Sequence, residues 1–161
     1  LGVIKGCGEK ADHFHRTRTS PDGGPAIATI KAALADAGLG EDAIGYINAH
    51  GTSTPENDKM EYGAMLSVFG DRLKDGIPCS SNKSMIGHTL TAAGAVEAVF
   101  SIQTMLTGTV PPTINYTNPD PSIVLDVVPN VKREASVSAV LSNSFGFGGQ
   151  NASLVMTREP V

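Results

Sequence analysis

The chain alternates between short apolar runs and longer segments with helical spacing. Apolar runs at residues 1–6, 43–49 and 77–80 are bounded by glycine, proline or polar residues, a pattern typical of buried strands. Small polar and apolar residues alternate at 136–141, and residues 152–157 have the composition of a further strand. The pattern therefore predicts five strands.

Two amphipathic segments between these runs predict helices. The apolar side chains of residues 25–37 fall on one helical face, and Gly38 follows as a C-cap. The second segment, 55–69, is preceded by Thr54 as a predicted N-cap and followed by Gly70. Proline at the first position of each segment supports both assignments, because its fixed φ suits the first helical turn.

A third helix is predicted over residues 92–106, where the side chains are apolar on nearly every side. Such a helix needs cover on most sides, so we expect it at the centre of the fold or against another domain. Glu97 lies within it, and burying a lone carboxylate is costly. We therefore expect Glu97 to have a cationic partner, with Lys83 the nearest candidate in sequence, unless Glu97 simply emerges at a surface.

Strands separated by helices, followed by a terminal hairpin, predict an α/β domain of three α/β/α layers. Its sheet is expected to be five-stranded and mixed, with the last strand antiparallel. A chain of 161 residues that is 40% hydrophobic fits one domain, residues 1–161. Because it begins at Leu1 within an apolar run, we expect it to belong to a longer polypeptide.

Charge and cysteine content narrow the class of protein. Charged residues make up 17% of the chain and the net charge is −4, which disfavours binding to nucleic acid or to a membrane surface. The densest basic stretch, residues 13–18, is either a solvated loop or a contact for an acidic partner.

Two distant cysteines, with no apolar run of eighteen residues, predict a reducing, cytoplasmic setting. No cysteine pair has zinc-ligand spacing, so no metal is predicted.

Two histidines are the first candidates for chemistry. His50 and His88 each follow shortly after a predicted strand, and open α/β sheets gather ligand groups at that edge. One such histidine is commonly structural, but the pair indicates a shared crevice. The aromatic and glycine residues of 145–151 allow close backbone approach and leave amides free for an anion; they are equally compatible with a flexible hairpin turn.

A nucleotide-binding alternative begins at residues 6–11, which fit the dinucleotide pattern G-x-G-x-x-A after a strand. We expect Gly6 and Gly8 to end that strand in a turn. No amphipathic helix follows at once, and the second strand ends in Asn48-Ala49-His50 rather than in an acid. The context therefore argues against dinucleotide binding.

Three ordered segments, 48–55, 81–88 and 143–151, resemble the β-ketoacyl-acyl carrier protein synthase family. The resemblance extends to residues 111–115 and 118–121, which look like the type II elongating enzymes. It implies the thiolase fold of two similar halves, of which this chain looks like the C-terminal half. It also implies an N-terminal half that lies outside this chain and carries the acylated cysteine.

The resemblance implies roles for the polar residues. Decarboxylation of malonyl-carrier protein leaves enolate charge on the thioester oxygen, and His50 and His88 match the histidines that stabilise it. Lys83 matches the lysine that orders the site, with Glu97 as its supporting partner.

Further positions match the family's acyl and pantetheine sites. Phe147 matches the gate of the acyl pocket, whose backbone amide helps form an oxyanion hole, and Phe145 is a supporting residue. Thr52 and Thr54 match residues that bind the pantetheine arm.

The chain also departs from the family pattern. Glu56, Ile86 and Thr91 stand where a small or apolar residue, threonine and glycine are usual, and Ile86 is expected to alter the pocket. Neither Cys7 nor Cys79 matches the nucleophile, so both are expected to be small buried residues.

The sequence thus predicts the C-terminal catalytic half of a 3-oxoacyl-acyl carrier protein synthase of fatty acid biosynthesis, an acyltransferase that is inactive without its other half. No cofactor is expected, since substrates arrive on the phosphopantetheine arm of acyl carrier protein. Expected partners are the N-terminal half and acyl carrier protein, with the full enzyme a homodimer. The alternatives are a polyketide or specialised lipid ketosynthase subunit and a non-catalytic carrier-protein-binding domain.

Overall fold

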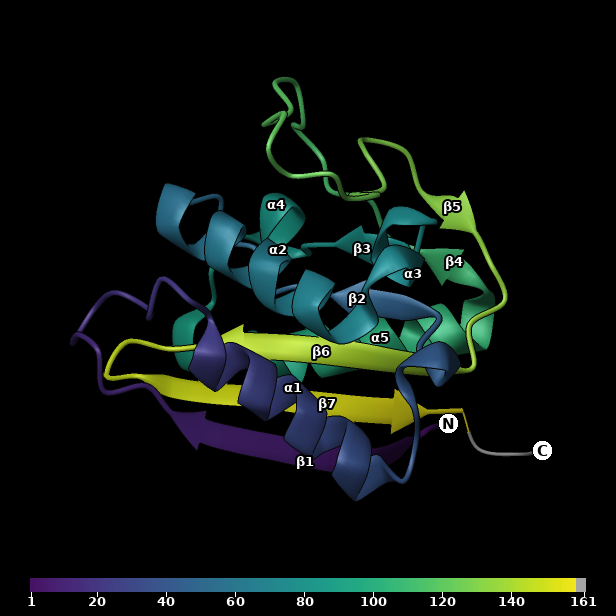
Figure 1. The fold of residues 1–161 in the computed structure, drawn as a ribbon. Helices are drawn as coiled ribbons and strands as arrows, with labels where there is room; N and C mark the ends of the chain where they lie inside the picture. Colours follow the sequence, from purple (N-terminus) through teal and green to yellow (C-terminus); the bar gives the residue numbers. More distant parts are fainter. Residues whose placement is uncertain (159–161) are drawn as a thin grey trace.

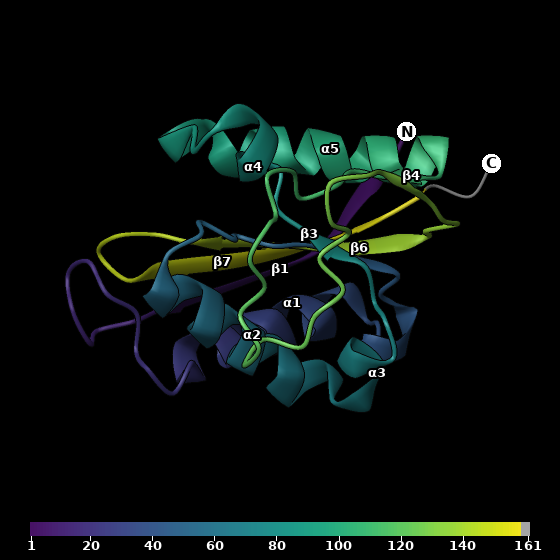
Figure 2. The same ribbon diagram turned by 90° about the horizontal axis from the view of Figure 1, so that it is seen from above.

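The computed structural model describes residues 1–158, which form a five-stranded sheet between two layers of helices (Figures 1 and 2). The strand order is β1-β7-β6-β2-β3, with β6, β2 and β3 mutually parallel and β7 antiparallel to both of its neighbours. Helices α1, α2 and α3 cover one face and α5 covers the other (Figure 2). The predicted three-layer fold, with a mixed sheet and an antiparallel last strand, is confirmed.

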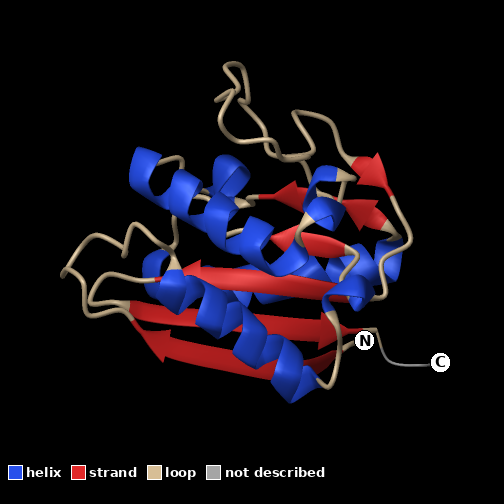
Figure 3. Ribbon diagram, viewed as in Figure 1, coloured by secondary structure: helices blue, strands red, loops and turns tan. Residues whose placement is uncertain are grey.

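The predicted strands and helices follow one another in the expected order, with further short elements between them that the hydrophobic pattern did not predict (Figure 3). The strands are β1 (Val3–Ala11), β2 (Tyr46–Asn48), β3 (Cys79–Ser80), β4 (Thr109–Val110), β5 (Arg133–Glu134), β6 (Ala139–Phe145) and β7 (Gln150–Thr157). The α-helices are α1 (Gly24–Ala37), α2 (Pro55–Phe69), α3 (Asp71–Lys74), α4 (Lys83–Ile86) and α5 (Ala93–Thr107). Two short 3-10 helices, η1 (Glu41–Ala43) and η2 (Leu90–Ala92), precede β2 and α5, and β4 pairs with β5 outside the main sheet.

The prediction for the first strand is wrong in two respects. Strand β1 continues through Gly6 and Gly8 to Ala11, and most of its residues are exposed because it is an edge strand. The glycines face α1 instead of ending the strand. A Cβ at Gly6 would lie 2.4 Å from the Ala33 oxygen, and one at Gly8 would lie 2.1 Å from the Thr29 oxygen. Glycine is needed here so that the helix can lie directly on the strand.

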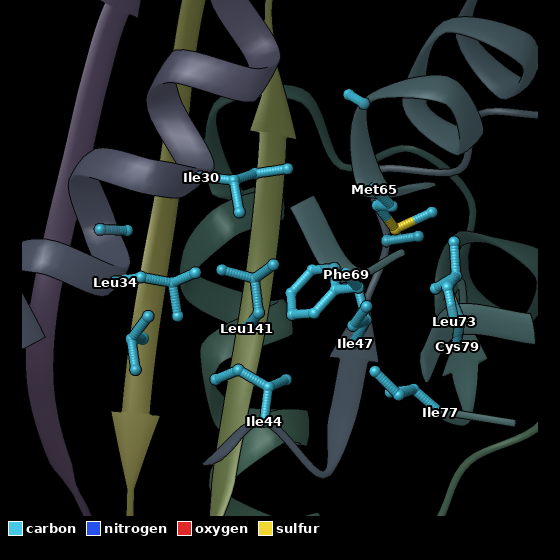
Figure 4. Packing of buried hydrophobic residues seen from close by; sticks show 14 of the residues in the cluster. Ile30, Leu34, Ile44, Ile47, Met65, Phe69, Leu73, Ile77, Cys79 and Leu141 are labelled. Carbon is cyan, nitrogen blue, oxygen red and sulfur yellow. The ribbon is translucent and has the colours of Figure 1, made fainter. Parts of the chain in front are cut away.

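The main hydrophobic core lies between the sheet and the layer of α1 and α2 (Figure 4). Ile30 of α1, Phe69 of α2, and Ile47 and Leu141 of the sheet contribute fully or almost fully buried side chains. Helix α2 has the predicted extent, α1 begins one residue earlier than predicted, and Gly38 ends α1 in the left-handed conformation at φ 65°. Thr54 occupies the N-cap position of α2 in extended conformation, but its side chain makes no capping bond.

Helix α5 is covered on one side only by the described part of the chain. Its buried positions are Ala93, Glu97, Ser101, Thr104 and Met105, three of them polar, whereas Val99 on the other side is 60% exposed. A place at the centre of this fold is therefore excluded for α5. The stretch Leu90–Thr107 is long and apolar enough to cross a membrane by length and composition, with 28% of it buried. An apolar helix packed on one side only meets the same criterion.

Candidate active site

The predicted site residues converge at one end of the sheet. The rings of His50, just after β2, and His88, just after α4, have centroids 5.5 Å apart and are nearly perpendicular at 82°. Phe145, the last residue of β6, packs edge-on against His50 at 5.8 Å. All three line an open cavity of about 1340 Å³. The structure thus brings together two histidines that lie far apart in sequence.

The orientation of His88 is set by a backbone hydrogen bond. The Leu90 amide donates to His88 Nδ1 at 3.1 Å, and Leu90 adopts a positive φ of 55°. Because Nδ1 accepts a hydrogen bond, the neutral ring carries its hydrogen on Nε2 and can donate from there. Burial and the nearby Lys83 ammonium lower the pKa of His88 below its usual value, which favours the neutral form.

His50 is more deeply buried, with 7% of its surface exposed. Burial, reinforced by the charges of Lys83 and His88, lowers its pKa to about 3. The ring is therefore neutral over the physiological range. Its Nδ1 atom has no hydrogen-bond partner within residues 1–158.

A buried carboxylate that the sequence analysis missed holds the backbone at His50. Glu61 of α2 accepts the amides of His50 and Gly51, each at 2.9 Å. The side-chain amides of Asn57 and Asn143 also donate to it, at 3.3 and 3.2 Å. Burial raises the pKa of Glu61 while these four donors oppose the rise. No comparable signal marks Glu61 in the sequence, because it follows the polar residues 56–59, whereas Glu97 stands within an apolar run.

Lys83 and Glu97 form a buried ion pair between α4 and α5, so the pairing inferred for Glu97 is present. Their side chains are 6% and 2% exposed. Burial raises the pKa of Glu97, and the hydrogen bond and charge of Lys83 oppose that rise. The Lys83 charge also acts on both histidines, where it favours the neutral rings. The pair thus connects the inner side of α5 to the catalytic candidates.

The glycine-rich segment forms the turn between β6 and β7 and rests on the loop that follows β1. The Gly148 amide donates to the Arg16 oxygen and the Asp12 amide donates to the Gly149 oxygen, both at 2.7 Å. A Cβ at Gly149 would lie only 1.7 Å from the Asp12 oxygen, so no side chain fits there. Phe147 lies at the tip of this turn on the cavity wall, 80% exposed. The turn therefore needs glycine at position 149 in order to meet the loop.

The remaining predicted residues are distributed around the cavity. The hydroxyl oxygens of Thr52 and Thr54 lie 3.0 Å apart on its wall, and Glu56 also lines it. Thr91 lies on the cavity wall, whereas Ile86 is 42% exposed and does not line this cavity, contrary to the expectation that it alters the pocket. Within residues 1–158, no group of three or more histidine, cysteine or acidic residues is placed to hold a metal ion.

The prediction that both cysteines are buried holds for one of them. Cys79 on β3 is 2% exposed, but Cys7 on β1 is exposed because β1 is an edge strand. Partial burial and the nearby Glu9 and Asp36 carboxylates raise the pKa of the Cys7 thiol. A raised pKa disfavours the thiolate that a nucleophile needs, so neither cysteine has the features of an acyl acceptor.

Comparison with known proteins agrees with this geometry. The architecture is the thiolase-like fold, shared with solved ketosynthases. The chain belongs to the β-ketoacyl synthase family: residues 1–117 match the model for "Beta-ketoacyl synthase, C-terminal domain".

The sequence is similar to proteins named 3-oxoacyl-[acyl-carrier-protein] synthase 2. It is 47% identical to the one from Coxiella burnetii over 96% of this chain and 37% of that protein. It is 48% identical to the one from Rhizobium meliloti over 96% of this chain and 36% of that protein. The chain thus spans little more than a third of the length of the curated relatives it matches.

Solved structures give the same likeness. A β-ketoacyl synthase from Burkholderia phymatum superposes with a TM-score of 0.90 at 39% identity, covering 99% of this chain and 38% of that one. A type II polyketide ketosynthase in complex with its acyl-carrier protein superposes with a TM-score of 0.95 at 37% identity, covering 98% and 38%.

Proposed function

We propose that this chain is the C-terminal catalytic half of a 3-oxoacyl-acyl carrier protein synthase, which extends an acyl thioester by decarboxylative condensation with malonyl-carrier protein. The observation that carries the proposal is the pair of imidazoles of His50, which is buried, and His88, which is exposed, with ring centroids 5.5 Å apart on the wall of one cavity and both pKa values lowered toward the neutral form. The names of the curated relatives support the same reaction.

The chemistry follows from where charge develops. When the malonyl carboxylate leaves as carbon dioxide, the electrons of the broken C–C bond pass into an enolate whose charge rests on the thioester oxygen. A neutral imidazole can donate a hydrogen bond to that oxygen, and a donor positioned in advance stabilises charge that forms only during the reaction. His88 is fixed as an Nε2 donor by the Leu90 amide. The enolate carbon then attacks the acyl thioester, and the thiol that held the acyl group leaves.

The acyl acceptor is proposed to lie in a separate N-terminal half. Neither cysteine of this chain suits the role, since Cys79 is buried in the core and the pKa of Cys7 is raised. The exposed apolar side of α5 supports a second domain packed against it, and the relatives are much longer. By this proposal the chain alone does not condense, requires no cofactor, and meets acyl carrier protein and the N-terminal half in a homodimeric enzyme.

A polyketide ketosynthase subunit is the second candidate, because one solved relative, at 37% identity, is a type II polyketide ketosynthase, and two others, at 39% and 36%, are ketosynthases described together with a chain length factor. Fatty acid synthesis is favoured because identity to the synthase 2 proteins reaches 47–48%. A third candidate is a non-catalytic domain that only docks carrier protein. His50, Lys83 and His88 all line one cavity, which argues against a domain that has lost its catalytic residues.

The test joins this chain to the matching N-terminal half and follows two steps separately. Carbon dioxide release from malonyl-carrier protein reports decarboxylation, and labelling by acyl-carrier protein reports acylation of the cysteine. We expect His50→Ala and His88→Ala each to slow decarboxylation by about 10²–10³-fold, while acylation falls far less.

His13→Ala is the matched control, because His13 is an exposed histidine that does not line the cavity. A folded enzyme whose decarboxylation is indifferent to His50 and His88 would establish the docking-domain alternative instead.

A further inference from the structure

The basic stretch noted in the sequence lies in loop 12–20, beside the glycine turn at the cavity (Figures 1 and 2). Asp12, at the start of this loop, is 6% exposed and holds its two ends together. Its carboxylate accepts the amides of Phe14 and Ser20, at 2.9 and 2.7 Å, and the hydroxyl of Thr19 at 3.3 Å. The loop is therefore closed on itself by a single buried acid.

A second set of contacts fixes this loop relative to the cavity. The Arg16 oxygen accepts the Gly148 amide, and the Asp12 amide donates to Gly149 on the same turn. The Thr17 amide donates to His15 Nδ1 at 3.1 Å, which adds a local turn within the basic stretch. The backbone that carries the basic side chains is thus anchored at both sides.

Two arginines of this loop are exposed and carry no partner charge. Arg16 and Arg18 line the same cavity as Thr52 and Thr54. No carboxylate of residues 1–158 forms an ion pair with either arginine, although Glu56 belongs to the same lining. A chain with net charge −4 therefore presents two exposed guanidinium groups, unpaired within residues 1–158, on the wall of the cavity that His50 and His88 also line.

We propose that Arg16 and Arg18 bind an anion that acyl carrier protein brings to this cavity, and so position the pantetheine arm above His50 and His88. This inference rests on the proposed function. The planar guanidinium suits phosphate and carboxylate equally. The anion is either the phosphodiester at the base of the pantetheine arm or carboxylates on the carrier protein itself. Exposed cations at the rim of an interface act mainly on the association rate and on its salt dependence.

The test uses the full-length enzyme and the double variant Arg16→Gln, Arg18→Gln. The matched control, Lys31→Gln with Lys74→Gln, removes two exposed cations from α1 and α3, which do not line this cavity. The same malonyl group is supplied on carrier protein, on coenzyme A and on N-acetylcysteamine. Carrier protein offers both anions, coenzyme A offers phosphate alone, and N-acetylcysteamine offers neither.

We expect kcat/KM with the carrier-protein thioester to fall about tenfold in the arginine variant, with a shallower salt dependence. A similar fall with coenzyme A assigns the contact to phosphate, and a fall confined to carrier protein assigns it to the carrier's carboxylates. An unchanged kcat/KM with carrier protein, or an equal loss on all three thioesters, would overturn the proposal.

Direct binding of carrier protein to the wild-type and variant enzymes separates this inference from the proposed function. If the wild-type enzyme binds carrier protein but condenses no thioester, the proposed function fails while the arginine contact is still measured. If binding is equal in the arginine variant and the control, the contact itself is refuted.

Discussion

The layer formed by α1 and α2 and the layer formed by α5 differ in which side of each helix is polar. Helix α1 turns Ile30, Leu34 and small residues toward the sheet, as an amphipathic helix normally does. Helix α5 turns Glu97, Ser101 and Thr104 inward and leaves Val99 exposed. The first layer completes a hydrophobic core within this chain, whereas the second combines a polar inner side with an unpartnered apolar outer side.

The two layers therefore contribute differently: α1 and α2 complete the main hydrophobic core, and α5 also carries a residue of the candidate site. The polar inner side of α5 supplies Glu97 to Lys83, whose charge acts on the two histidines. Toward its C-terminal end, Met105 joins a second apolar cluster with Val110, Val140 and Met156. Of the buried polar groups on α5, Glu97 reaches the site, whereas the Ser101 and Thr104 hydroxyls donate to backbone oxygens of α5 itself. The α1 and α2 layer reaches the site through Glu61, which holds the backbone of His50.

The largest effect is expected at the buried ion pair. In the full-length enzyme, Glu97→Gln leaves the Lys83 ammonium buried without its charge partner, and we expect a loss of about 3–5 kcal/mol in the free energy of unfolding. That is comparable to Phe69→Ala in the other layer, where a large buried ring is removed at a cost of about 3–5 kcal/mol. Denaturant titration measures both.

The double variant Lys83→Met, Glu97→Leu separates the cost of an unpaired charge from the contribution of the pair, because it removes both charges together. We expect it to unfold at a higher denaturant concentration than Glu97→Gln. If Glu97→Gln costs less than about 1 kcal/mol, the pair does not have the character of a desolvated ion pair.

A smaller effect is expected from the pH dependence of His50, which lies between the two layers. Its pKa falls from 6.5 to about 3 on folding. The unfolded chain therefore takes up a proton near pH 6.5 while the folded chain does not, so acid favours unfolding. The folded state keeps its full stability above pH 6.5 and loses about 2 kcal/mol from this group by pH 5.

His50→Gln removes this titration, so the difference in unfolding free energy between wild type and variant should shrink as the pH falls from 7 to 5. His15→Gln, an exposed histidine, serves as the control for histidine content. Parallel pH profiles for wild type and His50→Gln would show that His50 titrates normally in the folded enzyme.

The smallest effect tests whether the outer side of α5 is covered in the full enzyme. Val99 and Val124 are 60% and 59% exposed in this chain, so truncation to alanine would cost each about the same if nothing else packed there. We expect Val99→Ala to lower the unfolding free energy of the full-length enzyme by about 1 kcal/mol, and Val124→Ala to change it much less. Equal costs would show that nothing covers the outer side of α5 in the full-length enzyme.

Sequence reasoning located the helices more securely than the strands. Helices α1 and α2 carry proline at the start and glycine at the end, and these signals depend only on the backbone of the helix itself. Strand β1 was misjudged because Gly6 and Gly8 are required by residues of α1 that lie more than 20 residues later in the sequence. Contacts of that kind leave no local signal.

The sequence located the candidate site because its two histidines follow shortly after predicted strands. His50, His88 and the Lys83–Glu97 pair lie where the sequence placed them, because strand ends determine the edge of the sheet. Their catalytic roles stay predictions. Glu61 was missed because its importance comes from amides of residues in a loop and in β6, which only the folded chain assembles around it.

The two glycines of β1 also explain why residues 6–11 imitate a nucleotide-binding motif. A glycine in a sequence records only that something excludes a Cβ, and it does not record what. In a dinucleotide site the excluding group is a pyrophosphate; here it is the backbone of α1, which meets Gly6 and Gly8 from one side. A match to a glycine pattern therefore shows only that space is restricted at those positions. Which group restricts it has to be found from the rest of the chain.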